Sequence, residues 1–184
     1  MLTGPVHSGK TTLLRKLVPG LRDQKIAVDG YLSVAVFKDR ELIGYDLFDL
    51  KEEKASPFLR KKGKAHWERA GPYFFAPQAL EKAKRKILRR RRKDFLVVDE
   101  VGPLEIRGGG IWPELQAILS NPSLRCLLVA RRNILEEFRN LLKPVAPKIF
   151  DIESPDVFRL LREEIQKAGR VKNGRFSRAA VYEE

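Results

Sequence analysis

The stretch Gly4–Thr12, GPVHSGKTT, decides the fold that this sequence predicts. Gly4, Gly9, Lys10 and Thr11 fit the pattern G-x-x-x-x-G-K-[ST] of a phosphate-binding loop, in which backbone N–H groups surround a polyphosphate. The residues that follow are typical of a helix whose N-terminus faces the anion. We therefore expect the nucleotide to be held by Gly4, Pro5, Val6, His7, Ser8, Gly9, Lys10, Thr11 and Thr12.

Three residues of this loop have separate expected roles. Lys10 would neutralise the outer phosphates, and the hydroxyl of Thr11 would hold Mg²⁺. His7 occupies a variable position and is interpreted as a residue that packs or shapes the backbone rather than as a catalyst. The strand before the loop is reduced to Met1-Leu2-Thr3, although a parallel strand usually has about five residues. Either this strand is unusually short or the natural start lies upstream.

The run Phe95–Glu100, FLVVDE, predicts the second half of a nucleotide site. A continuous apolar run that ends in carboxylates is typical of a buried parallel strand. Because the carboxyl ends of such strands meet at one edge, Asp99 is expected to hold Mg²⁺ through water beside the loop. Glu100 would face the γ-phosphate and orient or deprotonate an attacking water. Lys10 and Glu100 are the candidate catalytic residues, and Thr11 and Asp99 are the candidate metal ligands.

Two arginines follow another predicted strand directly. Arg131 and Arg132 come after LRCLLVA, at the sheet edge where ligands bind, so one of them would reach a phosphate or stack on a base. We take Arg131 as the candidate, with a solvated loop arginine as an equal alternative. The Asn-Lys-x-Asp pattern that reads guanine is absent, which argues against a strict GTPase. His7 and His66 lie far apart and give no metal-ligand spacing.

The C-terminal half of the chain alternates between strand and helix patterns, which favours a mostly parallel sheet covered on both faces. We expect one α/β domain over residues 1–168 and a flexible tail over 169–184. The first helix, Thr11–Val18, should end or kink at Pro19-Gly20. After it, the sequence predicts a hairpin of strands 26–37 and 41–50, a polar surface loop at 51–69, a short aromatic strand at 71–75, a basic helix from Pro77, strands at 124–130 and 148–152, and helices at 111–119, 134–142 and 155–167.

The composition fits a soluble globular domain. Of 184 residues 43% are hydrophobic, and no run approaches the roughly 20 apolar residues of a membrane span. We therefore expect no membrane partner. Cys126 is the sole cysteine of the sequence, which excludes internal disulfides and favours a reducing cytoplasm.

The formal net charge of +13 is concentrated in the block Glu81–Asp94. Such a block is a candidate for nucleic-acid binding. Apolar residues nevertheless recur there at helical spacing, so we favour the solvated face of one amphipathic helix over the nucleic-acid interpretation. The apolar positions are Ala79, Leu80, Ala83, Ile87 and Leu88.

Four segments together resemble the THEP-type nucleoside-triphosphatase family, also called cancer-related nucleoside-triphosphatases. They are GPVHSGKTTLL, VDGYLSVAVFKDRELIGYDLFDL, AGPYFF and LVVDEVGPLE, and the similarity runs from Met1 to about Gln166. The resemblance implies a P-loop NTPase fold of the RecA-like kind, with a β-hairpin inserted after the first helix. It also implies Mg²⁺-dependent hydrolysis of the β–γ bond of ATP, GTP and other nucleoside triphosphates, with broad base tolerance. By position, Lys10 and Thr11 match the family's phosphate and metal ligands, and Glu100 its water activator. We expect a monomer.

The chain departs from this family pattern in two further places. In the hairpin the family usually has a Thr-Glu pair, where this chain has Ser33-Val34-Ala35. The family's Gly-Lys-Met-Glu is replaced by Gly102-Pro103-Leu104-Glu105, followed by a glycine-rich stretch that we expect to be flexible. Arg107 is the candidate to replace the missing lysine in space.

Two other functions remain open from the sequence. A small kinase would use Glu100 or Asp99 to activate an acceptor hydroxyl, with 51–69 as a candidate lid. A nucleotide-switched module binding RNA or DNA would use the basic helix. The triphosphatase is the favoured function.

Overall fold

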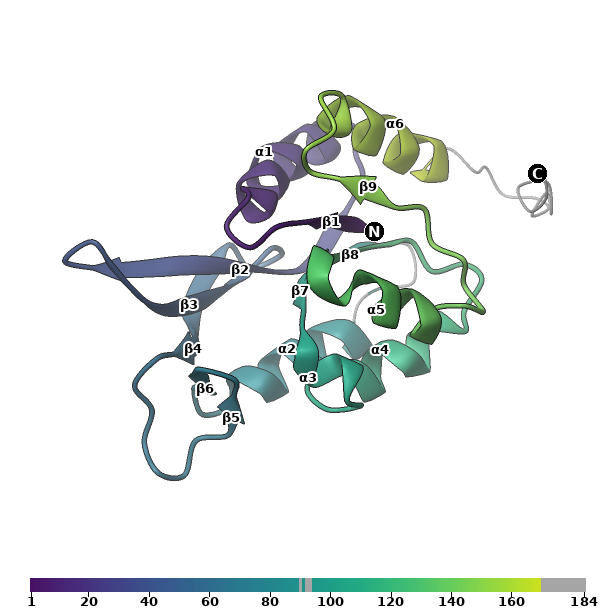
Figure 1. Cartoon of the computed structure of the whole chain (residues 1–184). Coiled ribbons are helices and arrows are strands. Elements are labelled where there is room, and N and C mark those ends of the chain that lie inside the picture. The colour runs from purple at the N-terminus through teal and green to yellow at the C-terminus, as the bar shows by residue number, and fades with distance from the viewer. Residues whose placement is uncertain (90, 92–93, 170–184) are drawn as a thin grey trace.

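A mixed β-sheet with helices on both faces makes up the part of the chain that the computed structural model describes, residues 1–89, 91 and 94–169 (Figure 1). The strands are β1 (Leu2–Gly4), β2 (Val28–Lys38), β3 (Glu41–Asp49), β4 (Lys54–Arg60), β5 (Arg69–Ala70), β6 (Tyr73–Phe75), β7 (Phe95–Val101), β8 (Cys126–Arg131) and β9 (Phe150–Asp151). The helices are α1 (Lys10–Asp23), α2 (Ala79–Arg89), α3 (Pro103–Ile106), α4 (Trp112–Leu119), α5 (Leu135–Leu141) and α6 (Val157–Gly169), with a 3-10 turn at Arg132–Ile134.

The strand order is β5-β6-β4-β3-β2-β7-β8-β1-β9. From β2 to β9 the neighbouring strands pair in parallel, as their continuous apolar runs predict. The predicted hairpin is confirmed as β2 and β3, and it extends the sheet with the antiparallel strands β4, β6 and β5. The parallel core therefore carries the phosphate loop, and the antiparallel extension lies on one side of it.

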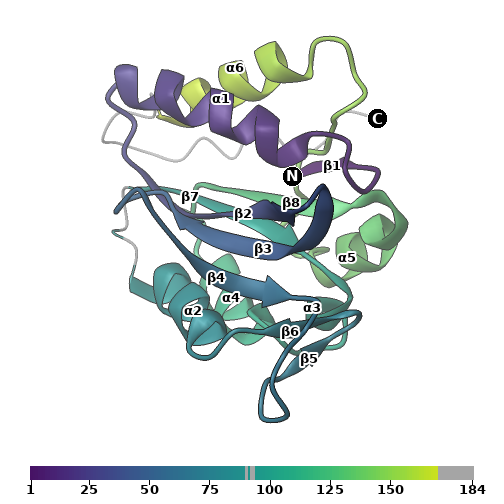
Figure 2. The same ribbon diagram turned by 90° about the vertical axis from the view of Figure 1, so that its left-hand side faces the viewer.

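Two apolar cores hold the helices to the sheet, one on each face (Figure 2). Helices α1 and α6 cover one face, where Leu14 and Leu17 pack with Leu161 over the strand residues Leu2 and Val129. On the other face, α2, α4 and α5 pack on β2, β7 and β8. The predicted α/β arrangement with helices on both faces is confirmed.

Helix α1 does not end at Pro19, where the sequence predicted either an end or a kink. It runs through Pro19 and Gly20 to Asp23. Leu17 and Val18 before the proline, and Leu21 after it, are all buried in the same core. Their shared packing offsets the loss of about 3 kcal/mol that an interior proline causes in a helix.

The segment 51–69 is not simply a loop, because it contains β4. Pro57 interrupts the alternation that would have identified this strand, and prolines inside sheets are found at edges or bulges. In the structure the register shifts here: Tyr45 of β3 pairs with Leu59, and Asp46 pairs with Pro57. The bulge accommodates Pro57, so β4 can add to the sheet.

The glycine-rich stretch after β7 is a tight turn around a buried carboxylate, rather than the flexible segment that we predicted. Glu105 of α3 is 6% exposed, and its carboxylate accepts the N–H of Gly102 at 2.9 Å and that of Ile111 at 3.2 Å. A Cβ on Gly110, whose φ is 59°, would lie 2.0 Å from this carboxylate. The glycines are therefore needed to let the chain close over Glu105.

Not all of the basic side chains of helix α2 lie on its solvent-exposed face. Ala79, Ala83 and Ile87 are buried as predicted, but Leu88 is 54% exposed. Lys86 turns inward, where its Nζ lies 2.7 Å from Asp49 and 3.4 Å from Asp29. Burial raises the pKa of Asp49, but the bonds from Lys86 and from backbone N–H groups outweigh it and leave the pKa below its usual value.

Replacing Lys86 by methionine is expected to lower the free energy of unfolding by about 3–5 kcal/mol, because the buried Asp49 loses its cation and Asp29 keeps only the half-exposed Lys51, at 3.7 Å. The depressed pKa of Asp49 makes this contribution present above the unfolded pKa of about 3.9, and it is lost as pH falls through the folded value. Denaturant unfolding at pH 7 and below pH 4 measures both effects. Arg85→Met, on the exposed side of the same helix, is the matched control. Equal stability of Lys86→Met and wild type would contradict this assignment.

Two sequence predictions remain outside these observations. The flexible tail was predicted over 169–184, but Gly169 is the last residue of α6, and residues 170–184 lie outside the described residues, as do 90, 92 and 93 of the basic block. The domain limit of 1–168 stays a prediction. Among the described helices, none combines the length and the apolar character needed to cross a membrane.

Candidate functional site

The loop between β1 and α1 closes around the side chain of Lys10. Lys10 is the first residue of α1 and is only 5% exposed. Its Nζ donates hydrogen bonds to the carbonyl oxygens of Gly4, at 3.2 Å, and Pro5, at 2.6 Å. Burial lowers the pKa of Lys10, while the nearby carboxylates of Glu100 and Asp99 act in the opposite direction. The ammonium is thus held at the centre of the loop and beside two acidic groups.

Two glycines explain why this loop can take its shape. Gly9 has φ 89°, a left-handed conformation, directly before α1. Gly4 ends β1, and a Cβ added there would lie 2.2 Å from Cγ2 of Ile152. Leu13 N–H bonds to the Gly9 carbonyl at 2.8 Å, so the helix starts at once. The N-terminus of α1 therefore opens toward the loop, as the sequence predicts.

Thr11 and Asp99 meet beside the loop, although they are 88 positions apart in the sequence. The Thr11 hydroxyl donates to Oδ2 of Asp99 at 2.7 Å, and the backbone N–H of Ser33 on β2 reaches the same oxygen at 3.3 Å. Asp99 is 2% exposed. Burial raises its pKa to about 7, against the opposing hydrogen bond from Thr11. A hydroxyl and a carboxylate oxygen side by side form a pair of hard oxygen ligands of the type that Mg²⁺ takes.

Glu100 does not bond to the loop but to Arg131. Glu100 is the next-to-last residue of β7 and Arg131 is the last residue of the neighbouring strand β8, and Nε of Arg131 donates to Oε1 of Glu100 at 2.5 Å. Burial lowers the pKa of Arg131, but the charge and hydrogen bond of Glu100 outweigh this and leave it raised. Arg131 thus lies in the site as predicted, and it contacts the candidate catalytic carboxylate.

A cavity of about 540 Å³ joins these groups. The loop residues 6–12, Asp99, Glu100 and Arg131 line one end of it. Apolar and aromatic side chains from β2, β4, β6 and α2 line the other end. The predicted loop, carboxylates and arginine are therefore brought together around one space.

The sequence analysis missed Tyr45 and Tyr73, which line the cavity between its two ends. Their rings pack edge to face with centroids 5.4 Å apart. Burial and a hydrogen bond that the Tyr45 hydroxyl donates to Tyr73 raise the pKa of Tyr45, and both phenols lie close enough to Arg131 to raise its pKa. Nothing in the sequence marks these tyrosines, because β3 and β6 meet Arg131 only through the folding of the sheet.

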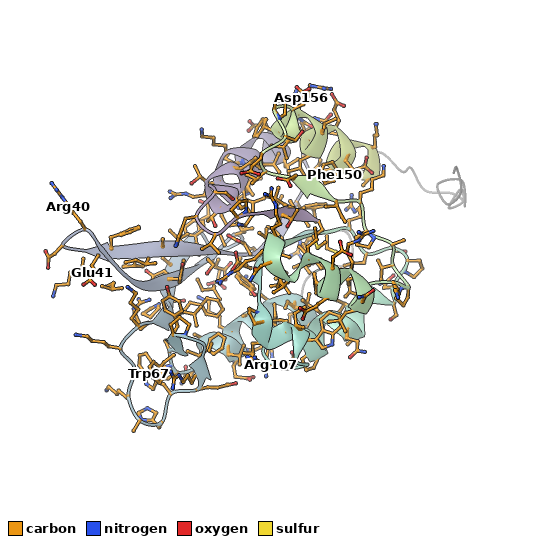
Figure 3. The ribbon with its side chains drawn as sticks, in the orientation of Figure 1. Arg40, Glu41, Trp67, Arg107, Phe150 and Asp156 are labelled. Atoms are coloured by element: carbon orange, nitrogen blue, oxygen red, sulfur yellow. The ribbon has the colours of Figure 1, made fainter. Side chains whose placement is uncertain are left out.

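The other sequence candidates fall in different places. Arg132 turns away and pairs with Asp151 at 2.7 Å and Glu153 at 2.6 Å. His7 is exposed with φ 59°, so it shapes the loop backbone rather than packing. Arg107 lines the cavity, and in Figure 3 it lies at the end of α3, on the same side of the sheet as Trp67. Among the described residues there is no group of three or more His, Cys, Asp or Glu side chains arranged to bind a metal.

Removing the contact between Arg131 and Glu100 is expected to slow any reaction that depends on the Glu100 position. Arg131→Gln should lower kcat by about 10- to 100-fold, and Arg131→Lys should restore only part of it, because lysine lacks the fixed geometry of the guanidinium. Steady-state kinetics checks this, with Arg132→Gln as the matched control. A normal kcat in Arg131→Gln would show that Glu100 needs no such partner.

The comparisons with known proteins agree on one family. A sequence model described as NTPase matches residues 1–167. The "Nucleoside-triphosphatase THEP1" of Metallosphaera sedula is 33% identical over 148 residues, covering 78% of this chain and 77% of that protein. The mouse "Cancer-related nucleoside-triphosphatase homolog" is 27% identical over 134 residues, with 67% and 70% covered. The solution structure of a human cancer-related nucleoside triphosphatase has a similar fold, with a TM-score of 0.70 and 24% identity over 95% of this chain and 97% of that one.

Proposed function

Because this chain belongs to the NTPase family that includes the THEP1 nucleoside-triphosphatases, we propose that it is a Mg²⁺-dependent nucleoside-triphosphatase that cleaves the β–γ bond and tolerates different bases. The observation that carries this proposal is the convergence of Lys10, Thr11, Asp99 and Glu100 on one cavity. They come from two strand ends that lie on either side of β8. A monomer suffices, since one chain supplies all of these groups.

The phosphate end of the cavity gives each residue a role. The loop N–H groups and Lys10 bind the β- and γ-phosphates and offset their charge. Thr11 and Asp99 would hold Mg²⁺, which supplies charge neutralisation at the phosphates when bound. The Thr11 hydroxyl and the Asp99 carboxylate already lie 2.7 Å apart, which fits this use.

Glu100 is the group that accepts a proton from the attacking water. Its carboxylate is kept in place by Nε of Arg131, and its strand end lies next to the residue that would hold the metal. The other N–H donors of Arg131 border the same cavity and can bond to oxygens of the γ-phosphate as charge develops there. The products are the nucleoside diphosphate and inorganic phosphate.

Broad base tolerance fits the absence of a motif that would read one particular base. The Asn-Lys-x-Asp pattern that recognises guanine is missing from the sequence. Hydrogen-bond donors and acceptors are what distinguish one base from another, so a site without a dedicated set of them discriminates weakly. Recognition would then depend on the triphosphate.

Product analysis tests the bond that is cleaved and the need for the metal. With ATP and Mg²⁺ we expect ADP and inorganic phosphate in equal amounts, and no release above background once EDTA removes the metal. AMP with pyrophosphate would place the cleavage at another bond. Full activity in EDTA would show that Thr11 and Asp99 do not work through a metal.

A further inference from the structure

The far end of the cavity has a lining that the hydrolysis of a triphosphate does not need. Six side chains form it, and we refer to the space between them as the aromatic chamber: Tyr31, Phe58, Leu59, Phe75, Leu80 and Ile111. Tyr31 and Phe58 pack edge to face at 5.8 Å, and Phe58 and Phe75 pack at 5.4 Å. None of the six carries a charge, and the buried carboxylate of Glu105, which also lines the cavity, accepts the N–H of Ile111 at 3.2 Å.

The chamber lies on the side of the site where the γ-phosphate of the nucleotide would be. Across the sheet, the strand of the loop, β1, is followed by β8, β7, β2, β3, β4 and β6. Glu100 is the next-to-last residue of β7, and the aromatic residues come from strands beyond it. Since Glu100 faces the γ-phosphate, the chamber borders the γ-phosphate on the side of β7 that is away from the loop. A nucleophile attacks phosphorus in line with the leaving group, so it approaches from the side opposite the nucleoside diphosphate.

The chemistry of the chamber differs from what an attacking water requires. An ordered water needs about two to four polar partners, whereas the six side chains that line the chamber are apolar or aromatic. Binding sites for small molecules are typically apolar with a few convergent polar groups that fix orientation. Here these groups are Glu100, Arg131, Tyr45 and Tyr73, which stand at the junction between the chamber and the phosphate end.

We propose that the aromatic chamber is a second-substrate pocket, which takes a small neutral molecule with a flat apolar body and one hydroxyl group. This inference rests on the proposed function, because it needs the γ-phosphate to face Glu100. The flat body packs against Tyr31, Phe58 and Phe75, and the hydroxyl points to the junction. Val34 and Ala35 of β2 border the cavity with small apolar side chains.

The transfer step balances with the groups already named. The acceptor O–H proton passes to the Glu100 carboxylate, the acceptor oxygen forms a bond to the γ-phosphorus, and the bond from phosphorus to the β–γ bridging oxygen breaks. The nucleoside diphosphate leaves with that electron pair. The products are the nucleoside diphosphate, a phosphate monoester of the acceptor and one proton. Water takes the same path when the chamber holds no acceptor.

The test uses 2-phenylethanol as the probe and ethanol as its control, since ethanol carries the hydroxyl without the apolar body. The full chain is incubated with ATP and Mg²⁺, and ³¹P NMR follows the phosphate monoester and inorganic phosphate together. We expect the ratio of monoester to inorganic phosphate to rise and saturate with 2-phenylethanol, at least about tenfold above ethanol at the same concentration, because the phenyl ring is buried.

Two variants reduce the space available to the acceptor. Leu80 of α2 lines the chamber and Ala70 of β5 lines the same cavity, so Leu80→Trp and Ala70→Leu should each bring the ratio down toward that of ethanol. Leu88→Trp, on the exposed side of α2, should keep the wild-type ratio. Because the ratio is measured within one sample, a partial loss of folded protein does not change it.

Three outcomes decide the proposal. Inorganic phosphate without any saturable monoester overturns the second-substrate pocket and leaves the triphosphatase intact. Competition of 2-phenylethanol with ATP also overturns it, because the chamber would then hold the nucleoside. Absence of both products, with and without the probe, would instead mean that the proposed triphosphatase itself fails.

Discussion

Replacing Glu100 by glutamine is expected to lower kcat for nucleoside triphosphates by about 100-fold or more, while the nucleotide Kd changes less than about threefold. Glutamine keeps the size of the side chain but cannot accept a proton. In the structure Glu100 contacts Arg131 and has no recorded hydrogen bond to the loop that would hold the phosphates. Binding and turnover should therefore separate in this variant.

The measurement pairs isothermal titration with a non-hydrolysable ATP analogue and a phosphate-release assay. Glu153→Gln is a suitable control, because Glu153 also pairs with an arginine but on the far side of β8, outside the cavity. It should behave as wild type in both assays. Equal turnover of Glu100→Gln and wild type would remove Glu100 from the mechanism.

Replacing Lys10 by alanine is expected to weaken nucleotide binding by about 100-fold or more, since a charge-assisted contact to phosphate is lost from a buried site. Lys10 is 5% exposed, and it also donates to the carbonyl oxygens of Gly4 and Pro5. The change therefore removes both a phosphate ligand and an internal support of the loop. Turnover should fall together with binding.

Titration with ATP and Mg²⁺ measures this effect, with circular dichroism to verify the fold. Lys16→Ala is the matched control, because Lys16 lies exposed on the same helix, α1. An unchanged Kd in folded Lys10→Ala would mean that the loop binds something other than phosphate.

The positions of residues that depend on a local sequence pattern could be predicted from the sequence. Gly4, Gly9, Lys10 and Thr11 form a contiguous loop, and its geometry follows from the glycines and from the helix start. Asp99 and Glu100 end an apolar strand, so the parallel core brings Asp99 to Thr11, as predicted. The family resemblance and the fold class are confirmed by the comparisons.

The residues that were missed depend on long-range packing. Strand β4 was not predicted because Pro57 interrupts its sequence pattern. It forms because a bulge in its pairing with β3 accommodates the proline. Pro19 suggested a helix end, but leucines on both sides share one core. The glycine-rich stretch after Glu105 was predicted to be flexible. It is ordered because the Glu105 carboxylate accepts the N–H groups of Gly102 and Ile111. Tyr45 on β3 and Tyr73 on β6 reach Arg131 on β8 across two and four intervening strands, and no spacing in the sequence encodes that approach.

The hairpin segment Ser33-Val34-Ala35, which replaces the Thr-Glu pair of the family, still contacts the site. At Ser33, where the resemblance led us to expect the loss of an acidic side chain, the chain offers a backbone N–H to Asp99 at 3.3 Å. Among the described residues of the cavity, Glu100 then remains the carboxylate at the junction between the phosphate end and the aromatic chamber. If the protein hydrolyses nucleotides without a carboxylate in the hairpin, Glu100 alone must activate the attacking water.

The most direct test of the account is phosphate release from ATP, GTP, CTP and UTP with Mg²⁺ and no added acceptor. We predict release from all four, with kcat/KM values within about tenfold of one another, which corresponds to differences of at most about 1.4 kcal/mol in transition-state stabilisation between the bases. Release from none of the four, in a protein that binds them, would contradict the claim that this site is a triphosphatase.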